Sequence, residues 1–274
     1  MTVELDTSLS RRQLHAITRE LSPAIARCEL THLAREPLDY SRALAQHAAY
    51  QQLLAALGVQ VTRLPAEPDL PDAVFVEDTA IVLDELAVIT HPGAPSRRAE
   101  VAAVEAALRP WRRLVHITAP ATLDGGDVLQ VGRNLYVGLS SRSNLAAVEQ
   151  LRQVLAPLGY RVEPVQVRGC LHLKSAVTAV HAGLLVLNPA WCDKAAFGDI
   201  ATIETDPTEA FGANVLRLDS SVIMGAAYPK TAARLRAHGV VVHTLDLSEL
   251  AKAEGAVTCC SLVFTTTSAA SAFE

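Results

Sequence analysis

A unit of strand, turn, strand, helix and strand recurs along this chain about every 48 residues. Paired apolar runs joined by short polar turns, such as AIVLDELAVIT and DVLQVGRNLYVGL, are typical of β-hairpins. Helical periodicity follows in four segments, and each is succeeded by a short β-rich run: Leu38–Leu57, Ser96–Leu108, Ser141–Leu155 and Lys230–Ala237. The recurrence predicts an α/β repeat architecture.

A polar or reactive residue stands at the expected head of the first strand in each unit. These residues are Glu77, Asp124, His172, Asp219 and Cys259. Five units around an axis would point all five toward one centre. The last unit starts too late to carry its own helix, so we expect the N-terminal segment Leu38–Leu64 to complete it and close the ring, which protects sheet edges. Five unrelated αβ segments in an open sheet are the alternative, but the regular spacing favours the ring.

Composition narrows the function classes. The chain has 274 residues, half of them apolar, which is enough for a core and excludes wholesale disorder. Its net charge of −5 supplies no basic surplus for nucleic acid. The start, MTVELDTSLSRR, lacks the apolar core of a signal peptide, and no stretch is a convincing membrane span. We therefore expect one domain over residues 1–274, located in the cytoplasm, with no nucleic acid or membrane partner.

The five cysteines are scattered and show neither CxxC nor CxxH spacing, so the sequence predicts no zinc-finger site. Buried cysteines are usually inert packing residues, and this is the default for Cys28, Cys170 and Cys192. Cys259 and Cys260, in GAVTCCSLVF, differ because they begin an apolar strand after a Gly/Thr turn. Side-chain alternation should direct one of this pair to the centre and pack the other behind it.

His172, in GCLHLKSAVT, stands two units before Cys259. A lone histidine is more often structural, but its place in the repeat distinguishes this one. A cysteine with a histidine meets the basic requirement of thiol catalysis, in which the imidazole moves protons. Asp124, in ATLDGGDVLQ, either belongs to a hairpin turn or orients His172, while Gly125 and Gly126 allow the backbone to approach a ligand closely.

Two further groups of charged residues suggest recognition of a molecule that carries both a planar cation and a carboxylate. Asp72, Glu77 and Asp78, in PDAVFVEDTAIV, form either a solvated edge or a set of acceptors for a planar guanidinium. Arg97 and Arg142 occupy equivalent places in two units, just before the helices. They are either helix-surface charges or a clamp for a carboxylate.

Several motifs together resemble the dimethylarginine dimethylaminohydrolase family. They are LPDAVFVEDTA, ITHPGAPSRRAE, ATLDGGDVL, VGLSSRSN, LHLKS and TCCS, in this order and spacing. The match runs from about Leu14 to the C-terminal strand. The wider group contains the arginine deiminases and amidinotransferases. The resemblance implies a five-bladed α/β propeller (pentein) of repeated ββαβ units around a central pseudo-fivefold axis, which agrees with the repeat count.

The resemblance also implies chemical roles. Cys259 would attack the guanidinium carbon of an Nω-methylated arginine, and His172 would protonate the leaving methylamine and then activate water. Asp124 would orient His172, and Cys260 would be the structural partner of Cys259. No redox or organic cofactor and no metal is required, because the thiolate and a water suffice. Zinc bound between Cys259 and His172 would be inhibitory.

Substrate contacts are implied in the same way. Glu77 and Asp78 would hold the guanidinium with Asp72 nearby, and Arg97 and Arg142 would hold the substrate carboxylate; the complete set of expected substrate-binding residues is Leu30, Asp72, Glu77, Asp78, Arg97, Arg142 and Ala253. Backbone groups near Leu30 and Ala253 would meet the α-amino group, with Leu30 on a mobile lid. The lid sequence ARCELTHLAREP matches the family weakly apart from Leu30, so the substrate class is better defined than the exact substrate.

Two alternatives remain. One is another enzyme of the same superfamily, such as an arginine or agmatine deiminase. The paired arginines Arg97 and Arg142 argue against agmatine, which has no carboxylate, and free-arginine deiminases generally carry an additional helical domain. The other alternative is a non-catalytic pentein scaffold, which would not need a cysteine, a histidine and an acid at three strand heads. The sequence leaves the oligomeric state open.

Overall fold

The computed structural model describes residues 12–267 and contains five three-stranded sheets. In each sheet the middle strand pairs antiparallel with one neighbour and parallel with the other. The sheets are β15-β1-β2, β3-β4-β5, β6-β7-β8, β9-β10-β11 and β12-β13-β14. The strand bounds are β1 Arg12–Arg19, β2 Gln60–Leu64, β3 Ala80–Val82, β4 Leu86–Ile89, β5 Arg113–His116, β6 Val128–Val131, β7 Asn134–Leu139, β8 Arg161–Gln166, β9 Val177–His181, β10 Leu184–Leu187, β11 Ala201–Glu204, β12 Val215–Leu218, β13 Ser221–Gly225, β14 Val241–Leu245 and β15 Leu262–Thr267.

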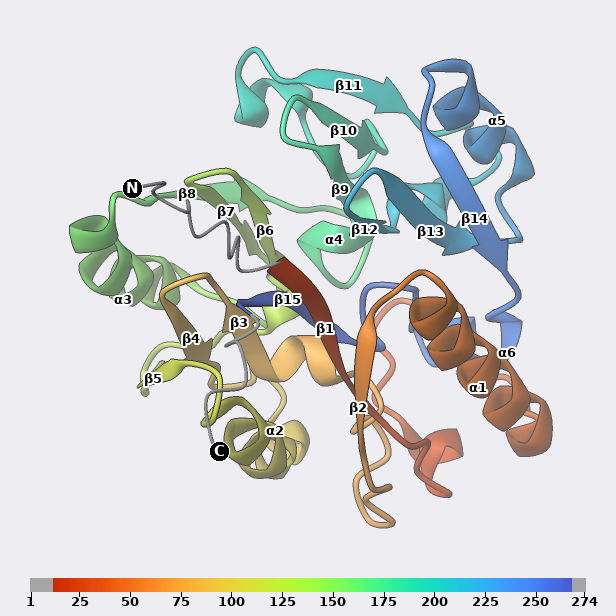
Figure 1. Ribbon diagram of the computed structural model, residues 1–274, viewed down its shortest axis with the longest axis horizontal. Coiled ribbons are helices and arrows are strands. Elements are labelled where there is room, and N and C mark those ends of the chain that lie inside the picture. Colours follow the sequence, from red (N-terminus) through yellow and green to blue (C-terminus); the bar gives the residue numbers. More distant parts are fainter. Residues whose placement is uncertain (1–11, 268–274) are drawn as a thin grey trace, which may run out of the picture.

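The connections explain why each parallel pair forms. A parallel pair needs a crossover, and in four sheets a helix supplies it. These helices lie outside the ring of sheets (Figure 1) and are α1 Tyr40–Ala56, α2 Val101–Leu108, α3 Leu145–Leu155 and α5 Pro229–Ala237. The sheet β9-β10-β11 has only the short 3₁₀ helix Lys194–Phe197 at this place. Two single-turn helices, α4 Leu173–Ala176 and α6 Ser248–Ala251, belong to loops.

Both ends of the chain build one sheet. Strand β15 pairs antiparallel with β1, in a register that places His15 opposite Phe264, and β1 pairs parallel with β2. The expectation that an N-terminal helix and strand complete the last unit is therefore confirmed, with β1 as the middle strand. Side chains from the first strands of all five sheets line one pocket, as expected for a ring of ββαβ units.

The fourth strand head was assigned wrongly. Asp219 lies in the tight turn between β12 and β13, in a left-handed conformation with φ +46°. Aspartate tolerates this conformation and favours such turns, so its polarity reflects turn chemistry. The residue that directly precedes β12 is Asn214, which follows a 3₁₀ helix at Ala210–Ala213. The fourth unit therefore begins earlier than the regular spacing suggests.

The core lies between each helix and its sheet and between neighbouring sheets. Helix α3 shows how the sequence produces this packing. Asn144 caps its first turn by accepting a hydrogen bond from the Ala147 amide. Val148, Leu151 and Leu155 then repeat at helical spacing and are buried against the sheet β6-β7-β8. In the part of the chain that the structure describes, no helix has the length and apolar character needed to cross a membrane.

Candidate active site

Short turns directly before the first strands, together with the residues that precede them, carry half of the expected functional residues: Glu77, Asp78, Asp124, His172 and Cys259. The turns are Val76–Thr79, Gly125–Asp127, α4 and the segment 258–261 before β15. They converge on a small cavity, here called the inner cavity. Among the expected residues, its lining contains Asp72, Asp78, Arg97, Arg142, His172, Ala253 and Cys259. The structure therefore brings together one thiol, one imidazole, two carboxylates and two guanidiniums.

His172 lies between two carboxylates. Its Nε2 is 3.1 Å from Asp124 Oδ2, and its Nδ1 is 3.8 Å from Asp78 Oδ1. Burial alone would lower the pKa of His172, but the negative charges of Asp78, Asp127 and Asp124 raise that pKa to about 9. The imidazole is consequently protonated at neutral pH, and a proton is available beside the thiol.

The glycines of the LDGGD motif allow this approach. A Cβ atom on Gly126 would lie 2.6 Å from His172 Nδ1, and one on Gly125 would overlap the carbonyl oxygen of Glu77. The Gly126 amide donates to Asp78 Oδ1 at 2.9 Å. We expected these glycines to admit a ligand; in the structure they admit the protein's own imidazole and backbone instead.

Asp124 is fully buried and held on several sides. The Gly93 amide donates to its Oδ1 at 2.9 Å, and the Asp124 amide donates to Ser143 Oγ at 3.0 Å. These contacts fix the carboxylate in the position from which it meets His172. The next acid of the motif, Asp127, accepts from the Leu173 amide and two serine hydroxyls, so it supports the turn that carries His172.

The two arginines differ in how much of their hydrogen-bonding capacity is used. Arg97 contacts Asp78 at 2.5 Å and Glu100 at 2.8 Å, and it also donates to the carbonyls of Asp72 and Phe75. Burial would lower the pKa of Arg97, but Glu100 and Asp78 hold it well above its usual range. Burial would likewise raise the pKa of Asp78, yet His172 and Arg97 lower it to about 2. Arg97 and Asp78 are therefore a charged pair in the cavity wall.

Arg142, in contrast, keeps a hydrogen-bond donor that could bind a ligand. Its residue is only 8% exposed, yet Nη1 has no hydrogen-bond partner among residues 12–267 and lies 3.7 Å from Asp124 Oδ2. Its Nη2 donates to Thr31 Oγ1 at 3.3 Å. A buried guanidinium with an unused donor is costly unless a further acceptor binds. Arg142 is thus the better placed of the two arginines to receive an anionic group.

The vicinal cysteines separate as the alternation of side chains predicted. Cys259 lines the inner cavity, whereas Cys260 is fully buried in the core behind it. Burial, followed by the charges of Glu77 and Asp78, raises the pKa of the Cys259 thiol to about 12. In the ligand-free site Cys259 is therefore a thiol, and it needs a nearby positive charge to ionise near neutral pH.

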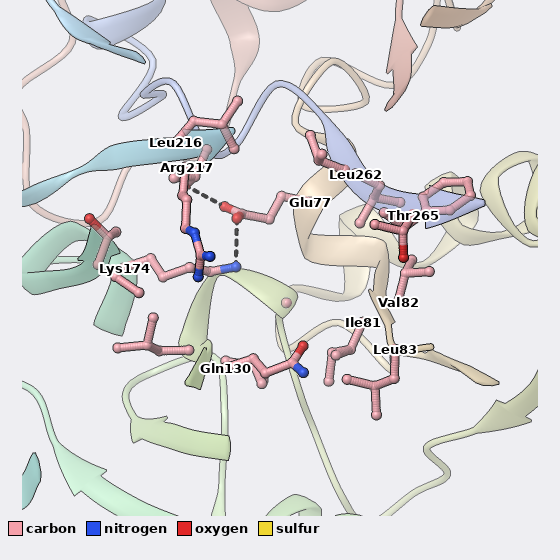
Figure 2. A pocket seen from close by; sticks show the side chains of 18 of the residues that line it. Glu77, Ile81, Val82, Leu83, Gln130, Lys174, Leu216, Arg217, Leu262 and Thr265 are labelled. Carbon is pink, nitrogen blue, oxygen red and sulfur yellow. Dashed lines mark hydrogen bonds and ion pairs between the residues drawn. The ribbon is translucent and has the colours of Figure 1, made fainter. Parts of the chain in front are cut away.

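Glu77 takes a different position from its neighbour Asp78. Its carboxylate lies 2.5 Å from Lys174 Nζ and accepts a hydrogen bond from Thr258 Oγ1 at 2.7 Å. Figure 2 shows this ion pair on the wall of the pocket lined by the first strands, here called the central pocket, of about 670 Å³. The Glu77 backbone also contacts Cys259, since its amide donates to the Cys259 carbonyl at 3.2 Å. A guanidinium contact for Glu77 stays a prediction.

The expected α-amino contacts lie at the edge of the inner cavity. Ala253 lines it, while Leu30 packs against the core and its neighbour Glu29 reaches the cavity wall. The Glu29 amide donates to both oxygens of Asp72, at 3.1 and 3.3 Å. Burial raises the pKa of Asp72.

Sequence reasoning missed several residues around the site. Asn214 donates to Thr258 Oγ1 and to the Lys174 carbonyl, and its Oδ1 accepts from the Thr258 amide, so it joins the two turns that carry Cys259 and His172. Asn214 directly precedes β12, the first strand of the fourth unit, and this position could have identified it. The regular spacing of the strand heads indicated Asp219 for that position instead. Glu254 also lines the inner cavity. It directly follows the expected residue Ala253, and no motif marked it.

Among the residues that the structure describes, one group has the spacing of metal ligands. Ligand atoms of Asp78, Asp124 and His172 all lie within 4.8 Å of one another. A metal there would have to displace the proton that His172 retains up to about pH 9 and would compete with Arg97 for Asp78. The expected reaction needs no metal, so any ion bound by this group would interfere with it.

Comparisons with known proteins identify the family of this chain. The arginine deiminase family model matches residues 66–211. The dimethylarginine dimethylaminohydrolase of Streptomyces coelicolor is 42% identical over 90% of this chain and 95% of its own, and that of Pseudomonas aeruginosa is 35% identical over 85% and 92%. A solved structure of the Pseudomonas aeruginosa enzyme, a Cys-to-Ser variant complexed with citrulline, superimposes with a TM-score of 0.87 at 33% identity, covering 91% of this chain and 98% of that one. The chain therefore belongs to the dimethylarginine dimethylaminohydrolase family, within the wider arginine deiminase group.

Proposed function

We propose that this protein hydrolyses Nω-methylated arginine, as dimethylarginine or monomethylarginine, to citrulline and the corresponding methylamine. The observation that carries the proposal is the inner cavity, where the thiol of Cys259, the protonated imidazole of His172 and the carboxylate of Asp78 share one wall. Citrulline, the expected product, is the molecule bound in the related Pseudomonas aeruginosa structure.

Charge complementarity orients the substrate. Asp78, with Asp72 nearby, accepts hydrogen bonds from the guanidinium, while Arg142 receives the α-carboxylate on its unused donor. Arg97 assists only to the extent that it turns away from Glu100 and Asp78. Main-chain carbonyls near Leu30 and Ala253 accept from the α-amino group. The remaining expected ligand, Glu77, reaches the guanidinium only if it leaves Lys174.

Substrate binding supplies the charge that the thiol requires. Asp78, one of the two carboxylates that raise the pKa of Cys259, is also the expected acceptor of the guanidinium, so the bound cation offsets its effect and favours loss of the thiol proton to solvent. The thiolate attacks the guanidinium carbon. As the bond from this carbon to the methylated nitrogen breaks, His172 transfers its proton to the leaving amine. An S-alkylthiouronium remains on Cys259.

The second half of the reaction reverses these roles. The neutral imidazole of His172 takes a proton from a water molecule, and the resulting hydroxide attacks the same carbon. The carbon–sulfur bond breaks, the departing thiolate takes the proton of the newly added hydroxyl group, and citrulline forms. Dividing hydrolysis in this way replaces one difficult step by two easier ones. Asp124 stabilises the charged imidazole and holds its ring in place through the 3.1 Å contact.

Cys259→Ser tests the nucleophile, and Cys192→Ala is the matched control because Cys192 is a buried cysteine of another sheet region. We expect the first variant to remain folded and to lose at least about a thousandfold in citrulline release, and the second to retain activity. Mass spectrometry of the wild type quenched during turnover should find the adduct on Cys259. Near-native activity of Cys259→Ser would contradict the mechanism.

A second candidate is a deiminase acting on another guanidino substrate, and the arginine deiminase family model over residues 66–211 favours it. A panel of dimethylarginine, monomethylarginine, arginine and agmatine separates the two. Methylated arginines should be the best substrates; arginine as the best substrate would replace our proposal by the second one.

We further propose that residues 1–274 act as one catalytic domain in the cytoplasm. The five free cysteines support the cytoplasmic location.

A further inference from the structure

One carboxylate holds the loop beside the inner cavity. Oε1 of Glu254 accepts hydrogen bonds from the amides of Thr31, His32 and Leu33, at 3.1, 2.6 and 2.7 Å, and Oε2 lies 3.1 Å from the Thr31 amide. The loop segment 31–33, here called the lid tip, has exposed side chains and belongs to no helix or strand. Three consecutive amides on one carboxylate form a charge-assisted anchor.

The lid tip and the cavity are physically linked. Glu254 lines the inner cavity itself, and Arg142, the guanidinium with an unused donor, contacts Thr31 Oγ1 at 3.3 Å. At the other end of the same loop, Ser96 Oγ donates to Glu29 Oε1 at 2.6 Å. The position of the lid tip therefore affects both the expected carboxylate clamp and the Leu30 main chain between these contacts.

The cavity is too small in this arrangement for an amino acid to enter. Its free volume is about 10 Å³, comparable to the space that one water molecule occupies. An arginine derivative can bind only after part of the cavity wall or the loop beside it has moved outward, and the exposed lid tip, which belongs to no helix or strand, is the segment best able to do so. The anchor between Glu254 and the lid tip must consequently break and form again in each cycle.

The backbone of Glu254 is unusual in a way that aims its side chain at the lid tip. Its φ is +57°, in the left-handed region where glycine is favoured. Its amide donates to the Ala251 carbonyl, and the following Gly255 amide donates to the Leu250 carbonyl, so the turn after α6 fixes this conformation. A side chain kept in a conformation that favours glycine indicates a role for that side chain.

We propose that Glu254 is a positioning residue that clamps the lid tip over the bound substrate and thereby sets how tightly the methylated arginine is retained. The inference rests on the proposed function for the identity of the ligand. The clamp acts on binding and release, while the bond-breaking steps stay with Cys259 and His172. Removing it should therefore affect KM more than kcat.

Glu254→Ala removes all three anchors, and Glu254→Gln keeps one neutral acceptor. We expect KM for dimethylarginine to rise about tenfold in the alanine variant and about threefold in the glutamine variant, while kcat changes by less than about threefold. Glu209→Ala is the matched control, because that carboxylate also accepts from consecutive amides, those of Lys230 and Thr231, but lies outside the inner cavity. It should leave KM unchanged.

Hydrogen exchange read by mass spectrometry tests the clamp without turnover. The amides of residues 31–33 should exchange at least about fivefold faster in Glu254→Ala than in the wild type and the Glu209→Ala control. Unchanged exchange overturns the clamp, even if KM rises, because Glu254 would then act on the ligand directly. Faster exchange with an unchanged KM overturns its role in retention. If the wild type releases no citrulline, the proposed function fails, whereas the exchange result still decides whether Glu254 anchors the lid tip.

Discussion

The inner cavity and the central pocket share the same turns, yet their charged groups are used differently. Within one turn Glu77 faces the central pocket and Asp78 faces the inner cavity, and Thr258 and Cys259 divide in the same way. The central pocket is far larger, about 670 Å³ against about 10 Å³, but on its wall Glu77 and Lys174 neutralise each other. In this molecule, volume is therefore a poor guide to the reactive site.

The inner cavity differs from the central pocket because several of its charged and titratable groups lack a neutralising partner. His172 carries a proton up to about pH 9 while Cys259 holds its own to about pH 12, and Arg142 keeps an unpaired donor. Groups left in such states can respond to a charged ligand. The wall between the two spaces, built from Glu77, Lys174 and Thr258, separates an open, balanced pocket from a closed, reactive one.

The strongest test of this division replaces each of the two neighbouring acids, in separate variants, by its uncharged amide. Asp78→Asn should lower kcat/KM for dimethylarginine by about a thousandfold, because the charge facing the guanidinium is lost. Glu77→Gln should lower it by only about tenfold, through weaker support of the turn. Steady-state citrulline release measures both. Equal losses would show that Glu77 also binds the guanidinium and that the two sides are not independent.

Lys174→Met probes the wall itself. It leaves the carboxylate of Glu77, which is only 6% exposed, without its ion-pair partner, so we expect the free energy of unfolding to fall by about 3 kcal/mol. Adding Glu77→Gln should recover a large part of that loss, because no unpaired charge then remains. Urea denaturation at neutral pH gives the four values of the cycle. If Lys174→Met is as stable as the wild type, Glu77 and Lys174 do not form a stabilising ion pair.

The pH dependence of catalysis measures the protonation of His172 in the inner cavity. In the substrate complex the Cys259 thiol has already lost its proton and His172 must be protonated to release the amine, so kcat should fall as the pH rises through about 9. Asp124→Asn removes a negative charge that raises the pKa of His172, and the falling limb should therefore move to lower pH, by about one unit. The control Asp219→Asn alters an acid of the β12–β13 turn and should leave the limb in place. An unmoved limb in Asp124→Asn would refute the orienting role of Asp124.

The smallest effect is expected in the central pocket. Arg217 points into this pocket near Lys174 and is exposed (Figure 2). Arg217→Ala should change kcat/KM by less than about twofold and the free energy of unfolding by no more than about 0.5 kcal/mol. The same assays as above measure it. A large loss of activity would show that the central pocket contributes to the reaction.

Much of this arrangement follows from local sequence patterns. Helix α1 and helix α5 were predicted to within a few residues, because apolar periodicity records which face is buried. The separation of Cys259 from Cys260 was predictable for the same reason, since successive side chains near a strand diverge. The recurring unit also predicted the convergence of Asp124, His172 and Cys259.

The failures share a physical cause. Turn chemistry placed Asp219 in a hairpin, although its polarity and spacing resembled those of a strand head. Neighbouring residues in a 3₁₀ turn point about 120° apart, so the adjacency of Glu77 and Asp78 did not place them in one space. The contact of Glu254 with the lid tip joins segments more than 200 residues apart through a left-handed turn, and no local pattern encodes it.

The sheet built from both ends of the chain has a consequence for folding. His15 pairs with Phe264, and such distant contacts form slowly because a very long loop must close first. Cys259 lies only three residues before β15, so it reaches its final place only when this last pairing is made. We expect a chain emerging from the ribosome to acquire its nucleophile as one of the final events of assembly. Refolding experiments should then show catalytic activity returning after most of the secondary structure has formed.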